Sequence, residues 1–427
     1  MDAISVVIFV LGYLAITLEG FTRVSKTAVA LVTAALLWTV LALGGGHTES
    51  LHAGLSHHLA TTSEILFFLL GAMTIVELVD AHDGFQIVTE RMRTTDTRVF
   101  TWLLSTITFF LSAVLDNLTT SIVMISILNR MVSDRKTKWM LLGLVVISAN
   151  AGGAWSPIGD VTTTMLWIGG QITPPEIVKH TLLASLACMA VSTAIVAFLL
   201  PGRIEPAASA GEASEEKSDP FARNLVLSIG IGALLFVPVF KSLTGLPPYM
   251  GMLLSLGIMW VLVEFIHSDK DETEKGLLSV NHALRKIDTP SILFFLGILM
   301  SVAALEHQGM LADVAGSLET VAGNPAVLAI GIGFLSSIVD NVPLVAALQG
   351  MYGPDSYPTD HYFWQLLAYS AGTGGSCLII GSAAGVAVMG MEKIDFFWYL
   401  RRVGWIAAAG YLSGAAVFLL QRSLSFT

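Results

Sequence analysis

Long apolar stretches recur along this chain and leave little room for a large soluble domain. The clearest windows reach or approach the roughly 20 residues that cross a bilayer as a helix, and they lie at about 3–18, 27–43, 181–200, 223–240, 249–266 and 404–420. Charged residues make up 13% of the chain, compared with roughly 25% in soluble proteins. Because backbone polar groups in lipid must be satisfied internally, these stretches predict an all-α, polytopic membrane protein.

The two halves of the chain carry the same motifs in the same order. Three blocks recur at offsets of 227, 224 and 222 residues: FFLLGAM (67–73) as FFLGILM (294–300), FFLSAVLDN (109–117) as GFLSSIVDN (333–341), and ISANAGGAWSPIGD (147–160) as YSAGTGGSCLIIGS (369–382). Chance similarity between apolar helices explains one such block but not three in register. We therefore predict two repeats, 1–200 and 223–422, joined by an acidic linker at 201–222.

Basic residues predict that the two repeats have opposite orientations in the membrane. Lysines and arginines flank the first Asp-Asn motif on both sides, at Arg91, Arg93, Arg98, Arg130, Arg135, Lys136 and Lys138. Both ends of that segment therefore belong in the cytoplasm, which favours a re-entrant hairpin at about 100–130 over a single crossing. No lysine or arginine lies between Lys286 and Lys393. The second hairpin, at about 325–352, is therefore expected to enter from outside.

The remaining loops complete the predicted topology. The loop at 44–64 has no lysine or arginine and is placed outside, whereas Lys179 and Lys241 are exceptions that the rule tolerates. Basic residues mark the cytoplasmic loops, namely Arg23, Lys26, Lys270, Lys275, Arg285 and Lys286. This predicts about ten transmembrane helices plus two re-entrant hairpins, with both termini outside. Inverted repeats with broken helices are the architecture of many secondary transporters.

Each hairpin is followed by a helix that the sequence predicts to be broken. Asn150 to Gly153 and Pro157 to Gly159 interrupt the helix at about 139–170, and Gly372 to Gly375 interrupts the helix at about 362–392. Two glycines in series cost a helix roughly 2 kcal/mol relative to alanine, and a proline removes a backbone donor. We expect both helices to unwind at these residues, where the freed backbone must line a cavity or contact protein.

The Asp-Asn motifs place carboxylates inside apolar segments, which is costly in a membrane and points to a site for cations or protons. Small hard cations prefer oxygen ligands, which side chains and freed carbonyls of both halves can supply. We predict that Na+ is held by Asp116, Asn117, Asn150 and Asp160. The full predicted set of ion- and proton-binding residues adds Thr119, Ser336, Asp340, Asn341, Thr373 and Ser376.

Small hydroxyl side chains in this set have an alternative role. Thr119, Ser336 and also Ser112 are explained equally well by hydrogen bonds to helix backbone or to a neighbouring helix, which are common in membrane proteins. Ser112 therefore stands in a second tier of candidates, together with Glu77 and Thr162.

The carboxylates of the two halves are expected to differ in role. A purely structural pairing of Asp116 and Asp340 with basic residues is disfavoured, because neither hairpin core contains a lysine or an arginine. Asp160 aligns with Ser382, so the first half has two acids where the second has one. This difference favours the first half as the seat of the cation, and leaves Asp340 as a proton site or a second ion ligand.

At these residues the chain resembles NhaD-type sodium/proton antiporters, members of the ion transporter superfamily that also holds arsenite permeases and divalent-anion sodium symporters. The resemblance covers essentially the whole chain and rests on LDN (115–117), SANAGG (148–153), IGD (158–160) and VDN (339–341). It implies a bacterial inner-membrane protein that forms a homodimer, with a scaffold part and a moving transport part in each repeat. It also implies functional positions at Asp116, Asn117, Asn150, Asp160, Asp340 and Asn341.

Together these features predict a secondary transporter, and not an enzyme, that exchanges Na+, and also Li+, for H+. Burial disfavours the ionised form of a carboxylate, so protons and Na+ compete for the same oxygens, and either one neutralises the acids for passage along an apolar scaffold. The expected surroundings are membrane lipid; neither a cofactor nor nucleic acid is expected to take part.

Three alternative functions are weighed against this prediction. The nearest is an ion-coupled carrier of arsenite or a dicarboxylate in the same superfamily, although acids at the hairpin tips argue against an organic anion. A passive channel is disfavoured because inverted broken repeats are typical of alternating access. A remote alternative is an intramembrane aspartyl protease that uses Asp116 and Asp160 to activate water, but it leaves the second Asp-Asn motif unexplained.

Overall fold

The computed structural model describes residues 2–17, 19, 24–44, 48–85, 94, 96–200, 202, 203, 220–268, 276–311, 314, 315, 318 and 322–425. Within these residues the chain is almost entirely helical, and the strand-like pairing there is one isolated bridge between Asp96 and Arg203. Eight of the described helices are long and apolar enough to cross a membrane. The predicted all-α, multi-pass fold is therefore confirmed.

Some sequence predictions fall outside the described residues. They concern most of the acidic linker and five basic residues used for the orientation, namely Arg23, Arg91, Arg93, Lys270 and Lys275. The division of the chain into two repeats stays a prediction.

The first half contains three helices, a hairpin, a broken helix and a long final helix. In chain order these are α1 (Asp2–Thr17), α3 (Lys26–Leu43), α4 (Thr48–Ala81), α6 (Thr97–Leu115), α7 (Asn117–Met131), α8 (Arg135–Gly153), α9 (Val161–Ile168) and α10 (Pro174–Leu199).

The second half contains corresponding elements with additional short helices. They are α11 (Pro220–Thr244), α12 (Pro248–Ile266), η1 (Gly276–Leu278), α14 (Val280–Lys286), α15 (Thr289–His307), α17 (Pro325–Ser336), α18 (Asn341–Met351), α19 (Tyr362–Gly374), η2 (Gly375–Cys377), α20 (Ala383–Glu392), α21 (Phe396–Tyr399), the π-helical turn η3 (Leu400–Gly404) and α22 (Trp405–Ser425).

Local sequence signals explain where many of these helices begin. Asp134 accepts a hydrogen bond from the backbone N–H of Thr137 at 2.8 Å at the start of α8, and Asn324 does the same for Ala326 at 2.7 Å at the start of α17. Such caps satisfy amide groups that have no partner within the helix. Proline occupies the first turn of α10, α12, α15 and α17, where its missing N–H has no cost.

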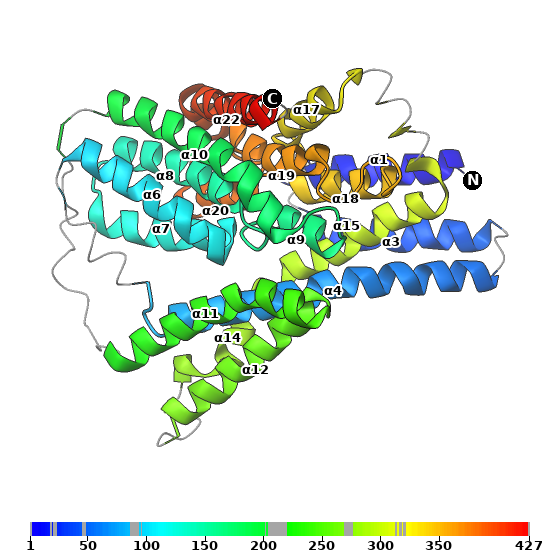
Figure 1. Ribbon diagram of the computed structural model, residues 1–427, viewed down its shortest axis with the longest axis horizontal. Coiled ribbons are helices and arrows are strands. Elements are labelled where there is room, and N and C mark those ends of the chain that lie inside the picture. The colour runs from blue at the N-terminus through cyan, green and yellow to red at the C-terminus, as the bar shows by residue number, and fades with distance from the viewer. Residues whose placement is uncertain are drawn as a thin grey trace.

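The helices form two groups, and in Figure 1 α6 to α10 of one group lie above α4, α11, α12 and α14 of the other. We call α6 to α10 with α17 to α22 the hairpin group; in it α10 packs on α22, α6 on α8, and α17 on α19. We call α1, α3, α4, α11, α12, α14 and α15 the α4 group; in it α3 packs on α15, and α11 and α12 pack on α4. The contacts of α15 with α18 and of α4 with α9 join the two groups.

The two hairpins extend in opposite directions along the long axis of the molecule. Figure 1 shows α6 and α7 in its left half, in cyan, and α17 and α18 in its right half, in yellow and orange. Asp116 is the single residue that separates α6 from α7, and residues 337–340 separate α17 from α18. The turns of the two hairpins therefore point toward the middle of the protein.

The glycine pairs lie inside helices, which corrects the expectation that the helices unwind at them. The helix α8 runs through Gly152 and Gly153 and breaks only at residues 154–160, and the second helix breaks at 378–382, after η2. A Cβ atom on Gly152 would collide with the backbone carbonyl of Phe109 in α6, and one on Gly374 with that of Gly333 in α17. The glycines therefore let each broken helix pack directly against a hairpin backbone.

Candidate functional site

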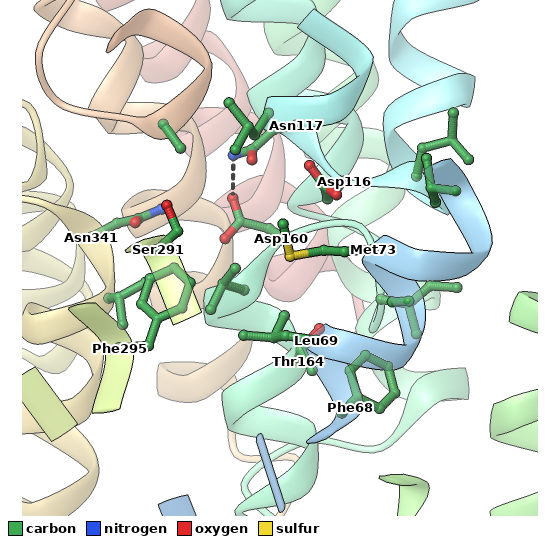
Figure 2. Close-up of a pocket in the computed structure, with 18 of the residues that line it drawn as sticks. Phe68, Leu69, Met73, Asp116, Asn117, Asp160, Thr164, Ser291, Phe295 and Asn341 are labelled. Carbon is green, nitrogen blue, oxygen red and sulfur yellow. Dashed lines mark hydrogen bonds between the residues drawn. The ribbon is translucent and has the colours of Figure 1, made fainter. Parts of the chain in front are cut away.

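The turns of both hairpins open onto one cavity of about 70 Å³. Asp116 and Asn117 reach it from the first hairpin, Asp340 and Asn341 from the second, and Asp160 from the break between α8 and α9. Figure 2 shows Asp116, Asn117 and Asp160 side by side, with Asn341 across the cavity from them. The cavity thus collects the polar motifs of both halves of the chain.

The opposite wall of this cavity is largely apolar and comes from the α4 group. Its lining side chains are Phe68, Leu69, Ala72, Met73, Val76, Leu234, Met252, Phe294 and Phe295. The cavity therefore lies at the boundary between the two helix groups, with its carboxylates on the hairpin group. Moving uncompensated carboxylates past such a wall is costly, because charges lose solvation in apolar surroundings.

Asp116 lies in a backbone conformation that favours glycine, with a φ of 81°. Its side chain caps α7: one carboxylate oxygen accepts from the backbone N–H of Thr119 at 2.8 Å, and the other accepts from the Thr119 hydroxyl at 2.9 Å. The two hydrogen bonds hold both carboxylate oxygens in a defined orientation at the edge of the cavity. The backbone conformation itself costs about 1–3 kcal/mol.

Asp160 caps α9 and is linked directly to the first hairpin. One of its carboxylate oxygens accepts from the backbone N–H and the hydroxyl of Thr162, both at 2.8 Å. The other accepts from the Asn117 amide at 2.9 Å, the contact drawn as a dashed line in Figure 2. Asp160 is only 2% exposed, and its place at a helix N-terminus favours a negative charge there.

Asn150 joins the two broken helices through its side-chain amide. Its carbonyl oxygen accepts from Asn117 at 3.0 Å, and its NH2 group donates to the hydroxyls of Ser376 and Ser382, both at 2.9 Å. Ser382 caps α20, as Asp160 caps α9. Ser382 was absent from the predicted site, although its alignment with Asp160 was a signal that pointed to it.

Two of the predicted serines hold the backbone together. The Ser112 hydroxyl donates to the carbonyl of Ala149 at 2.6 Å, and the Ser336 hydroxyl donates to the carbonyl of Ala371 at 2.8 Å. Each bond fastens a hairpin to the broken helix that follows it. Among the side chains that the structure describes, neither serine lines the cavity. Their contacts therefore agree with the alternative role, which is to link neighbouring helices.

Two other candidates lie apart from the cavity. The Thr373 hydroxyl donates to the carbonyl of Tyr369 in its own helix, at 2.5 Å. Glu77 pairs with Lys286 of α14 at 2.9 Å. The structure therefore does not bring Thr373 or Glu77 into contact with the three aspartates of the cavity.

Asp340 has a basic partner, contrary to the expectation from the hairpin sequences. The ammonium group of Lys26 lies 3.2 Å from one carboxylate oxygen of Asp340 and 4.5 Å from the centre of the Phe294 ring. Lys26 is the first residue of α3 and lines the cavity, whereas the sequence placed it in a cytoplasmic loop. The expectation was wrong because the partner comes from 314 residues away in the chain.

The chain is similar to known transporters over nearly all of its length. A model of the citrate transporter family matches residues 13–374. Sodium/proton antiporter 1 of Arabidopsis thaliana is 49% identical over 425 residues, which cover 100% of this chain and 73% of the relative. Sodium/proton antiporter 2 of the same plant is 45% identical over 414 residues, with 96% and 98% covered. The Na+/H+ antiporter NhaD of Vibrio cholerae is 30% identical over 453 residues, with 99% and 92% covered.

Proposed function

The chain belongs to the citrate transporter family and to the NhaD-type sodium/proton antiporters, and on this premise we propose that it exchanges Na+ for H+ across a membrane. The observation that carries the proposal is the single cavity that collects Asp116, Asp160 and Asp340 at the boundary between two helix groups. Carboxylate, amide and hydroxyl oxygens are suitable ligands for a hard cation. The relatives named sodium/proton antiporters support the same activity.

The proposed seat of Na+ is formed by Asp116, Asn117, Asn150 and Asp160. Among the residues that the structure describes, no lysine or arginine forms an ion pair with Asp116 or Asp160. Both carboxylates are instead oriented by neighbouring N–H and O–H groups. They can therefore be neutralised by an incoming Na+ or by protons, and the two compete because they use the same oxygens.

Exchange follows from the cost of moving an uncompensated charge. When Na+ or protons neutralise the carboxylates, the hairpin group can shift along the apolar wall of the α4 group; when the site is empty, this movement is disfavoured. Only loaded forms cross, so the inward movement of protons drives the outward movement of Na+. The proposal extends to Li+, which is smaller and equally dependent on oxygen ligands.

Citrate or another organic anion suits the cavity less well than a cation does. Asp116, Asp160 and Asp340 bring three carboxylates to the cavity lining, and the basic residue among its lining side chains is Lys26. An anion with two or three charges would be repelled by them, because like charges in a poorly solvated site repel strongly. The proposed substrate is therefore Na+, although the matching family is named for citrate.

We also propose a location and an assembly for the protein. The expected location is the bacterial inner membrane, with both termini outside, and the expected assembly is a homodimer. Basic residues at the cytoplasmic ends of the predicted helices support the orientation. The resemblance to NhaD-type antiporters supports the membrane and the dimer.

Reconstitution of the purified protein in liposomes tests the proposed exchange. An inward Na+ gradient should move protons out of the vesicles and change the signal of an internal pH indicator, and Li+ should do the same. The assay is run with the membrane potential clamped and with it free, which reports whether net charge moves. Citrate and arsenite are the matched controls. A response to either of them with no response to Na+ would contradict the proposal.

A further inference from the structure

The ion pair between Lys26 and Asp340 lies within the cavity that the transported cations are proposed to use. Both side chains line it, and the Lys26 ammonium is 3.2 Å from the carboxylate. The ammonium also faces the ring of Phe294, a favourable arrangement for a cation. The chain therefore places a cation of its own at the one carboxylate that the second hairpin contributes to the cavity.

This ion pair also bridges the two helix groups. Lys26 begins α3 in the α4 group, whereas Asp340 caps α18 in the hairpin group. By contrast, the ion pair of Lys286 with Glu77 stays within the α4 group, and those of Lys138 with Glu392 and of Lys179 with Glu176 stay within the hairpin group. If the hairpin group shifts relative to α3, the contact between Lys26 and Asp340 must therefore break, or the Lys26 side chain must move with Asp340.

We propose that Lys26 is a tethered competitor of the transported cation. Its ammonium occupies Asp340 while no Na+ or proton is bound there, and an arriving cation displaces it. The displacement releases α18 from α3 and thereby couples cation binding to the movement of the hairpin group. This inference rests on the proposed exchange of Na+ for H+ and assigns a role to a residue outside the proposed Na+ seat.

The strength and surroundings of the pair suit a contact that forms and breaks. The side chains of Lys26 and Asp340 are 25% and 19% exposed, and partly exposed pairs are weaker than fully buried ones. A second carboxylate is close to the start of α3, because Glu19 accepts a hydrogen bond from the backbone N–H of Lys26 at 2.9 Å. The displaced ammonium can therefore remain near a negative charge.

The Na+ dependence of exchange in liposomes tests this role. In Lys26→Met the competitor is removed, so the Na+ concentration for half-maximal exchange should fall roughly two- to fivefold, the factor that corresponds to a partly exposed ion pair. Lys26→Arg keeps the cation and should retain the wild-type value. Lys26→Gln provides a second neutral variant in case the methionine variant does not fold.

A double-variant comparison separates competition from a merely structural role. In the Asp340→Asn background the ion pair is already absent, so Lys26→Met should not change the affinity for Na+ any further. If Asp340→Asn abolishes exchange, the comparison is made instead on the Na+-dependent rise in melting temperature of the purified proteins. A structural role predicts lower stability and a lower maximal rate without tighter Na+ binding.

Two results would overturn the inference: an unchanged or higher half-maximal Na+ concentration in the neutral Lys26 variants, or a decrease that persists when Asp340 is replaced. Either result in a protein whose wild type exchanges Na+ for H+ leaves the proposed function intact. Absence of exchange in the wild type contradicts the proposed function itself.

Discussion

Asp116 combines a carboxylate with a backbone conformation that favours glycine. The strain of its φ of 81° is offset in part by two hydrogen bonds from Thr119. Asparagine has nearly the same shape as aspartate and also caps helices well. The position therefore tolerates a neutral amide structurally. Replacement by asparagine removes the charge of the side chain and keeps its shape.

Replacement of Asp116 by Asn is expected to abolish Na+-dependent proton movement while the fold stays intact. The amide can still accept a hydrogen bond from Thr119, but it cannot take up a proton or balance the charge of Na+. Exchange in liposomes measures the first effect and the melting temperature of the purified protein measures the second.

Asp134→Asn is the matched control for this substitution. It makes the same change at another capping aspartate, which is exposed at the start of α8 and is not among the residues that line the cavity. The control should exchange at the wild-type rate. Normal exchange by the Asp116 variant would remove Asp116 from the mechanism.

At the scale of elements, the two hairpins contact their broken helices in the same way. Ser112 and Ser336 each donate to a carbonyl of the following broken helix. Gly152 and Gly374 each lie against the backbone of the hairpin that precedes them. These contacts keep each hairpin turn in register with its helix break, and so keep the polar groups of both halves at the cavity.

Gly152→Ala is expected to destabilise the protein by about 1–3 kcal/mol, the usual cost of overpacking. The added methyl group would collide with a backbone carbonyl of α6, and a backbone cannot rotate away as a side chain can. The melting temperature of the purified protein should fall, and exchange should weaken because the break moves relative to the hairpin.

Gly257→Ala in α12 is the control, because its Cβ would meet no atom within 4 Å. Alanine is also the better helix former. The control should therefore match or exceed the wild-type melting temperature. Equal melting temperatures for the two variants would show that the close contact between α8 and α6 does not contribute to stability.

At the scale of the whole molecule, the hairpins extend in opposite directions (Figure 1), and residues of both turns line one cavity. The proposed shift between the helix groups would open this site to one side of the membrane or the other. The orientation of the hairpins relative to the two sides of the membrane remains a prediction from the basic residues.

Cysteine labelling tests that orientation. Ser133→Cys, next to the end of α7, should react with a membrane-impermeant reagent from the cytoplasm, and Ser356→Cys, after α18, from the exterior. Both positions are exposed. The native cysteines, Cys188 and Cys377, are buried, which keeps background labelling low. Reaction of both introduced cysteines from the same side would contradict the inverted arrangement.

The parts of the site that follow from local patterns were predictable from the sequence. The sequence pointed to Asp116 and Asp160, which both line the cavity, because a carboxylate is rare in an apolar stretch and because their motifs recur. The role of the glycine pairs was not predictable, since helix propensity describes an isolated helix and not the hairpin backbone that packs against it. Lys26, the partner of Asp340, was missed because the sequence does not distinguish a lysine at the start of a predicted helix from a lysine in a solvated loop.

The sequence by itself determined that the chain is an all-α membrane protein with acids placed at corresponding points in two similar halves. Apolar length, repeated motifs and loop charges carry that information because lipid imposes the same requirements on every segment. Only the tertiary structure decided which of these groups meet. Asn150 reaches Ser376 and Ser382, and Lys26 reaches Asp340, because packing brings together helices that are hundreds of residues apart.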